Sequence, residues 1–126
     1  MKYQEFIKHV QTLGQINSID EAQRATQATL ETIRERVVGN EASQLAAQLP
    51  QELAQYLQGR EGENGQHFAV TEFYHRVTEK EGVEPTTAVV HTRAVFAALQ
   101  SAVTPGEFAD VKANFSEDYA ELFAQN

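Results

Sequence analysis

The sequence predicts an all-α fold: a tandem, pseudo-twofold repeat of a four-helix unit, about eight helices in all, that forms one compact helical domain. Three observations predict it. Apolar residues recur at steps of three and four, the spacing that lines one face of a helix. The same order of long and short helical patterns occurs twice, at an offset of 66 or 67 residues. No stretch alternates apolar and polar residues for long enough to build a sheet.

The first copy begins with a short helix and a long one. In the short helix, which ends near Gly14, one face carries Tyr3, Phe6, Val10 and Leu13. The long helix covers Ser18 to Val38, and its apolar face carries Ile19, Ala22, Thr26, Leu30, Ile33 and Val37. Ser18 can cap its first free amides while Glu21 reaches back, which makes a capping box. Gly39 is expected to end it.

Two short helices complete the first copy. Asn40 is expected to cap the first of them, whose apolar residues are Ala42, Leu45, Ala46 and Leu49. Pro50 fits the first turn of the second, because proline lacks only an N–H that would be unpaired there. The apolar stripe of this last helix consists of Leu53, Tyr56 and Leu57.

The second copy repeats this order from Val70. Phe73 and Val77 stand where Phe6 and Val10 stand, at an offset of 67 residues. A second long helix follows, with Val89, Thr92, Phe96, Leu99 and Val103 on one face. The run from Thr104 to Glu107 supplies a cap, a first-turn proline and a capping-box acid together. Ser116 is expected to cap the final helix.

The copies are assigned to residues 1–58 and 68–126, with a linker at 59–67. Polar and small residues also match between them, including Glu5 with Glu72, Glu41 with Glu107, and Ala54 with Ala120. The stretch QGREGENGQH, from Gln58 to His67, has no large apolar residue and is predicted to be a flexible, solvated linker. Because about 60 residues bury a core only marginally, the two halves are expected to pack together as one unit.

Composition and charge exclude several classes of function. The chain is 41% hydrophobic and 22% charged, which is typical of a globular protein with a real core. Its formal charge of −8 repels phosphate backbones and anionic lipids, so neither nucleic acid nor membrane is an expected partner. The absence of cysteine excludes disulfides and thiolate chemistry. With no signal-peptide-like or membrane-spanning apolar run, a soluble cytoplasmic protein is expected.

The pattern resembles a known family. A phenylalanine helix in each half, "EFIKHV" and "EFYHRV", accompanies the alanine-rich "DEAQRATQATLETIRERV" and the segment "NEASQLAAQLPQEL". Together they resemble the prokaryotic proteins grouped as domain of unknown function 2267, over nearly the whole chain. The second half departs from the pattern at "VKANFSEDY", where Phe115 and Ser116 replace the Leu-Pro pair. The resemblance implies an all-helical fold and carries no established activity, cofactor or catalytic residue.

Few residues suggest a metal-binding or catalytic site. Glu72 and His75 have the Glu-x-x-His spacing of di-iron helix bundles, but Lys8 replaces the histidine in the first half, so a surface pair is favoured over a metal site. His91 lies beside an apolar stripe, and we expect it to be partly buried and bonded to a neighbouring helix. The acidic pairs, such as Glu79 with Glu81, fall opposite the apolar stripes and are expected to be solvated. No catalytic, cofactor-binding or metal-binding residue is assigned.

Two functions remain open. The first is a non-catalytic protein-interaction or scaffolding module whose partner is another protein or a second copy, with Tyr74 and Phe68 as its candidate surface. Closing the edge of the core is the alternative role for Tyr74. The second is a small-molecule binding protein or enzyme with its site in the crevice between the repeats. Convergent polar groups there, such as His91, Glu72 or Arg93, would favour it, and a solid apolar seam would oppose it.

Overall fold

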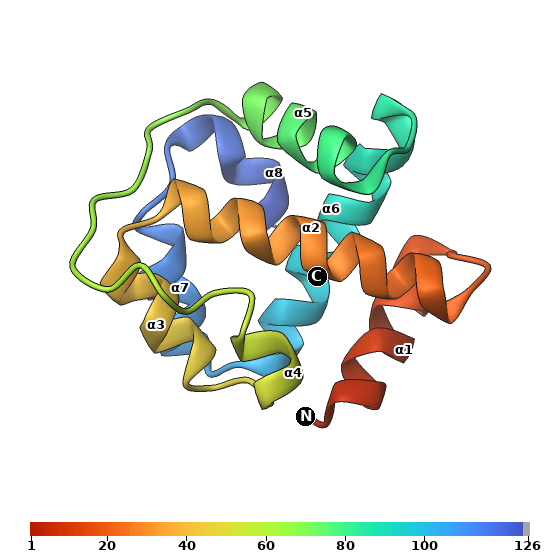
Figure 1. Ribbon diagram of the computed structural model, residues 1–126, viewed down its shortest axis with the longest axis horizontal. Helices are drawn as coiled ribbons and strands as arrows, with labels where there is room; N and C mark the ends of the chain where they lie inside the picture. Colours follow the sequence, from red (N-terminus) through yellow and green to blue (C-terminus); the bar gives the residue numbers. More distant parts are fainter. Residues whose placement is uncertain (125–126) are drawn as a thin grey trace.

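The computed structural model describes residues 1–124, and this part of the chain is helical, with no strand (Figure 1). The all-α prediction is therefore confirmed. No helix among the described residues is long and apolar enough to cross a membrane. The elements are α1 Tyr3–Gly14, α2 Ile19–Arg36, α3 Gly39–Ala46, α4 Gln51–Ala54, α5 Val70–Glu81, α6 Pro85–Ala102, α7 Pro105–Lys112, the 3-10 helix Glu117–Tyr119 and α8 Ala120–Phe123.

The two 18-residue helices, α2 and α6, pack against each other at the centre. Both α1 and α5 pack against the two of them, so each long helix contacts a short helix from either half, and α3 packs on α7 (Figure 1). One apolar cluster runs through both halves. It is lined by small residues in the first half, such as Ala22, Ala25 and Ala28, and by edge-to-face aromatic rings in the second, such as Phe73 with Phe96 and Tyr119.

Local chemistry sets several helix ends as predicted. The Ser18 hydroxyl accepts a hydrogen bond from the Glu21 amide at 3.1 Å, and the Thr104 hydroxyl accepts one from the Glu107 amide at 3.2 Å. These bonds satisfy amides that have no partner within the helix. Pro105 is in the first turn of α7. Helix α1 ends at Gly14, with Gln15 in the left-handed conformation at φ 51°.

Other expectations about boundaries and faces are wrong. Pro50 precedes α4 instead of entering its first turn, and Ser116 makes no capping bond. Asn40 does not cap α3; its side-chain oxygen accepts from the Gly62 amide at 2.8 Å. Ile19 and Leu13 were expected on apolar faces but are 53% and 44% exposed. Each side chain lies near a helix end, where the helical repeat no longer fixes which residues the rest of the chain covers.

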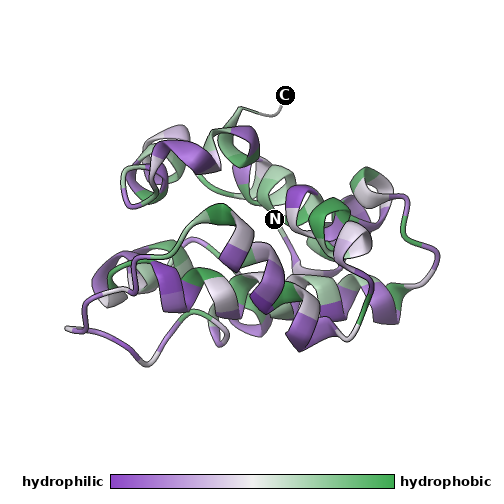
Figure 2. Cartoon of the chain, turned by 90° about the horizontal axis from the view of Figure 1, so that it is seen from above, coloured by the Kyte–Doolittle hydropathy of each residue, from purple (hydrophilic) through white to green (hydrophobic). Residues whose placement is uncertain are grey.

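The segment between the halves is polar, as expected, but it is anchored to the body. Figure 2 shows it as the largely hydrophilic loop at the left edge. Its Gln66 amide donates to the Glu35 carbonyl at 2.9 Å, and its Glu63 carbonyl accepts from the Gly39 amide at 2.9 Å. The segment is mostly exposed, as predicted, but it is not a flexible linker, because its backbone has hydrogen-bond partners at the α2–α3 junction.

Gly39 is part of this contact. The prediction that it ends α2 is wrong. Helix α2 ends at Arg36, and Gly39 is the first residue of α3. A Cβ atom on Gly39 would lie 1.6 Å from the Arg60 carbonyl oxygen. Glycine is therefore required by close approach of the linker backbone and not by helix termination.

We expect Gly39→Ala to lower the free energy of unfolding by about 3 kcal/mol, because the added methyl group forces the linker away from α3. Urea denaturation measures this change. Gly106→Ala is the matched control: it also lies in the first turn of a helix, and nothing lies within 4 Å of its Cβ position. The control should be neutral or stabilising. Equal stability of the two variants would contradict the packing described.

Candidate functional site

The most unusual polar group is a buried histidine between two carboxylates. His91, on α6, is 3% exposed. Its Nδ1 lies 2.7 Å from a carboxylate oxygen of Glu81, the last residue of α5, and its Nε2 lies 3.2 Å from a carboxylate oxygen of Glu21, in the first turn of α2. The expectation that His91 bonds to a neighbouring helix is confirmed, and its burial is deeper than expected. We call these three residues the His91 triad.

Both carboxylates of the triad differ from their expected roles. The Glu81 side chain is fully buried and not solvated, and its second oxygen, Oε1, has no hydrogen-bond partner in the described structure. The Glu21 backbone takes part in the predicted cap, but its side chain contacts His91. A sequence signal existed for Glu81: it follows Phe73 and Val77 at steps of four, so the apolar stripe of α5 extends onto it.

A surface depression of about 320 Å³ opens beside the triad. Both halves of the chain contribute to it: the α1–α2 turn and the first turns of α2 on one side, and the first half of α6 on the other. It is lined by Gly14, Gln15, Ile16, Asn17, Glu21, Thr86, Thr87, Val90 and His91. Of the polar groups expected in such a crevice, His91 lies in it, whereas Glu72 and Arg93 do not line it.

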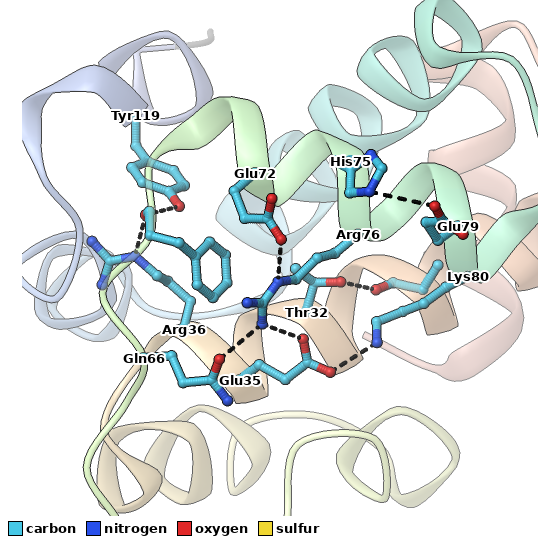
Figure 3. Close-up of polar contacts among 12 residues, drawn as sticks. Thr32, Glu35, Arg36, Gln66, Glu72, His75, Arg76, Glu79, Lys80 and Tyr119 are labelled. Carbon is cyan, nitrogen blue, oxygen red and sulfur yellow. Dashed lines mark hydrogen bonds and ion pairs between the residues drawn. The ribbon is translucent and has the colours of Figure 1, made fainter.

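A second polar cluster joins α2 to α5 and is shown in Figure 3. The Arg76 guanidinium donates to Glu72 at 2.9 Å and to Glu35 and Gln66 at 3.1 Å each. Lys80 donates to Glu35 at 2.8 Å. Burial raises the pKa of Glu35, but the hydrogen bonds and charges of Lys80 and Arg76 outweigh it and leave that pKa below its ordinary value. Every charge in this cluster has an opposite neighbour, so the cluster holds two helices together.

Glu72 and His75, also drawn in Figure 3, do not contact a common partner. Glu72 bonds to Arg76, while the His75 Nε2 lies 3.3 Å from Glu79 on the exposed side of α5 (Figure 3). Among residues 1–124, no group of three or more histidine, aspartate and glutamate side chains is arranged to hold a metal ion. The spacing therefore reflects two helical ion pairs.

Tyr74 and Phe68, the candidate interaction surface, both contact other parts of the chain. Tyr74 is half-buried, and its hydroxyl donates to Glu121; burial and this bond raise the pKa of the phenol. The Phe68 ring lies under the Arg76 guanidinium, 3.9 Å from its centre to the Cζ atom. Each ring therefore has a packing role, and its use by a partner stays a prediction.

A third cluster is a pair of glutamates between α3 and α7. Glu41 and Glu107 occupy matching positions in the two halves and lie side by side in the fold. Burial raises the pKa of Glu107 to about 7, and the hydrogen bond and negative charge of Glu41 add to the effect. The two carboxyl groups therefore share a proton at neutral pH and below.

These features define a class: an all-helical domain with a central pair of long helices and a polar triad at one edge. The chain belongs to the family described as an uncharacterized conserved protein (DUF2267), which it matches over residues 3–122, so the family resemblance predicted from the sequence is confirmed. No curated protein matches the chain. The family supplies no assigned reaction or ligand, and function has to be argued from the geometry above.

We expect the Glu41–Glu107 pair to make stability depend on pH. The folded state keeps the Glu107 proton up to a pH of about 7, whereas an unfolded glutamate releases it near about 4.3. The stabilisation that the folded state gains from holding the Glu107 proton is therefore complete below pH about 4.3. It is lost as the pH rises through about 7. Replacing Glu107 by Gln should leave stability similar at pH 4.5 and raise it by roughly 3 kcal/mol at pH 8, relative to the unmodified chain.

Chemical denaturation at both pH values measures this difference. Glu52→Gln is the control, because Glu52 is an exposed glutamate on α4. The control should change stability equally at the two pH values. A Glu107→Gln variant that shows the same constant change would contradict a shared proton.

Proposed function

We propose that the protein is a non-catalytic protein-interaction module that binds its partner at the corner formed by the α1–α2 turn and the first half of α6. One observation carries the proposal. Of the five large hydrophobic residues that are exposed among the described residues, three belong to segments at this corner: Leu13, Ile19 and Val90, at 44%, 53% and 48% exposure. Val90 lines the depression itself, and Leu13 and Ile19 are next to lining residues in the sequence or at the start of the same helix. Exposed apolar side chains of this kind are typical of a protein-binding surface.

The chemistry of the corner supports binding more than catalysis. The depression combines the apolar Ile16 and Val90 with the polar Glu21 and His91, a combination that can hold an anchoring side chain of an interface. The chain's net charge of −8 favours a partner with a basic surface over nucleic acid. With no cysteine in the chain, we place this interaction in the cytoplasm. The aromatic pair Tyr74 and Phe68 is the second candidate surface.

The same depression is the basis for the alternative function, a small-molecule binding protein or enzyme. His91 lines the depression, and histidine is the side chain that most often transfers protons in enzymes. The central helices contribute to one core cluster, and the depression lies beside their N-terminal turns. This arrangement favours the interaction module.

We also propose that the domain is built of two repeats, residues 1–58 and 68–126, joined by the segment 59–67. Three features support this. Helix lengths of 12, 18 and 8 residues occur in this order in both halves. The buried Thr26 and Thr92 stand 66 residues apart, and each hydroxyl donates to the carbonyl four residues earlier at 2.8 Å. Both α1 and α5 pack on the two long helices, which is what a pseudo-twofold axis would produce.

The interaction proposal predicts a position-dependent crosslink. A photo-crosslinking amino acid at position 13 or 90, introduced in the cells from which the protein comes, should capture the same protein from both positions. Position 38 is the matched control, since Val38 is 42% exposed but lies at the α2–α3 junction. Mass spectrometry of the adducts identifies the partner. Adducts that do not differ between position 38 and the other two would contradict the proposal.

The repeat proposal predicts that neither half folds alone. Residues 1–60 and 66–126, expressed separately, should show little helical circular dichroism, and mixing them should restore it, because each half leaves its long helix without the other. Two fragments that are stably folded and do not bind each other would refute a shared core.

A further inference from the structure

We propose that the pocket between the end of α7 and α8 binds an apolar amino acid, with the carboxylate of the ligand paired to Lys112 and its ammonium group to Glu117. The pocket has a volume of about 420 Å³, which lies in the range of small-molecule sites. It is separate from the depression beside the His91 triad, because no residue lines both. The proposal therefore goes beyond the interaction at that depression. The pocket is lined by Lys112, Phe115, Ser116, Glu117, Ala120 and Phe123.

The same part of the fold is closed in the first half of the chain. The residues 66 positions before four of the lining residues are buried, at 9% exposure or less. In the second half, by contrast, Lys112 and Ala120 are exposed and Phe115 is half-buried. A place that belongs to the core in one half is therefore an open pocket in the other. The buried residues are Ala46, Leu49, Ala54 and Leu57, which correspond to Lys112, Phe115, Ala120 and Phe123.

The two halves also differ in how they can hold a chain segment. Segment 59–63 lies against the start of α3, where it bonds to the Gly39 amide, the Asn40 side chain and the Ser43 hydroxyl. The start of α7 lacks these groups, because Pro105 has no N–H and Gly106 and Ala109 have no polar side chain. No other part of the described chain lies within 4 Å of the Cβ position of Gly106. The second half cannot hold a polar extended peptide in this way, which favours a small molecule in the pocket.

The aromatic rings in the pocket select an apolar side chain. The ring centroids of Phe115 and Phe123 are 5.2 Å apart, and the rings are tilted by 52°. A third ring can contact them at the offset or edge-to-face geometries that aromatic pairs prefer, and a branched aliphatic chain can contact the same faces. Ala120 contributes only a methyl group, so it leaves most of the volume open. The ligand is therefore expected to carry an aromatic or branched aliphatic side chain.

Two opposite charges line the same pocket. Lys112 and Glu117 are both exposed, and neither makes an ion pair with any residue in the range 1–124. A ligand with a carboxylate alone would leave Glu117 unpaired, and the chain's charge of −8 would repel it. An amine alone would leave Lys112 without a counter-charge. An amino acid supplies both charges and is neutral overall, so it complements the pocket.

Isothermal titration calorimetry of the full chain tests the proposal, with L-phenylalanine and L-leucine as probes. We expect one probe to bind per chain. Removing either charge of the ligand should weaken binding about fivefold, the effect of one exposed ion pair. 3-Phenylpropanoate, which lacks the ammonium group, and phenethylamine, which lacks the carboxylate, make this comparison with the same ring.

Variants of the two charged residues assign each group of the ligand to its partner. Lys112→Gln should weaken binding of L-phenylalanine but not of phenethylamine, because the amine has no carboxylate to pair with Lys112. Glu117→Gln should weaken binding of L-phenylalanine but not of 3-phenylpropanoate. Lys8→Gln and Glu52→Gln are the controls, because both side chains are exposed and lie outside this pocket. The controls should bind L-phenylalanine as the unmodified chain does.

A variant that fills the pocket tests the apolar contact without changing a charge. Ala120→Leu should abolish binding. Ala109→Leu is its control, because Ala109 is an exposed alanine on α7 that does not line the pocket. Circular dichroism checks that both variants are folded, and the comparison of ligands on the unmodified chain decides the question if Ala120→Leu is not.

Four results would each overturn the proposal: no binding of either amino acid, equal affinity for 3-phenylpropanoate or phenethylamine, normal binding of L-phenylalanine by either charge variant, or normal binding by a folded Ala120→Leu. None of these results bears on the crosslinks at positions 13 and 90. The amino acid site and the proposed interaction can therefore fail separately.

Discussion

The placement of the second half depends on one buried cation, Arg36, at the end of α2. Its side chain is 3% exposed, and its Nε and Nη1 donate to the carbonyls of Phe68 and Asn114 at 2.9 Å and 3.0 Å. The guanidinium also lies over the rings of Phe68, Phe115 and Tyr119 at 5.2–5.8 Å. Carbonyls and ring faces replace the water that burial removes, so the charge is stabilised without a carboxylate of residues 1–124 at ion-pair distance.

This contact determines the position of α5, and through it the His91 triad. Arg36 binds the backbone at Phe68, two residues before α5 begins, and the same carbonyl accepts from the Tyr119 hydroxyl at 2.7 Å. Arg76 and Lys80 then fasten α5 along α2 by their bonds to Glu35. The far end of α5 is thereby held against α6, where Glu81 meets His91. The contacts at the start of α5 thus help to fix the position of Glu81, at its end, relative to His91.

The sequence predicted the features that depend on residues close together in the chain. The two long helices, the caps at Ser18 and Thr104 and most of the apolar core follow from spacing and from amides near them in sequence. Gly39, Arg36 and the triad were not predictable in this way, because their roles depend on residues at least ten positions away in the sequence. Arg36 follows Ile33 by three residues, so it extends the apolar stripe, but a charge at a helix end normally indicates solvent.

The three polar contacts between helices differ in how their charges are paired. Around Glu35, cations and carboxylates balance, so the α2–α5 contact is complete within the chain. Between Glu41 and Glu107, a shared proton does the same for α3 and α7 below neutral pH. The His91 triad alone of these contacts combines two carboxylates with one imidazole and opens onto a depression. His91 and Glu21 line that depression, so this is the polar contact that a partner bound there would meet.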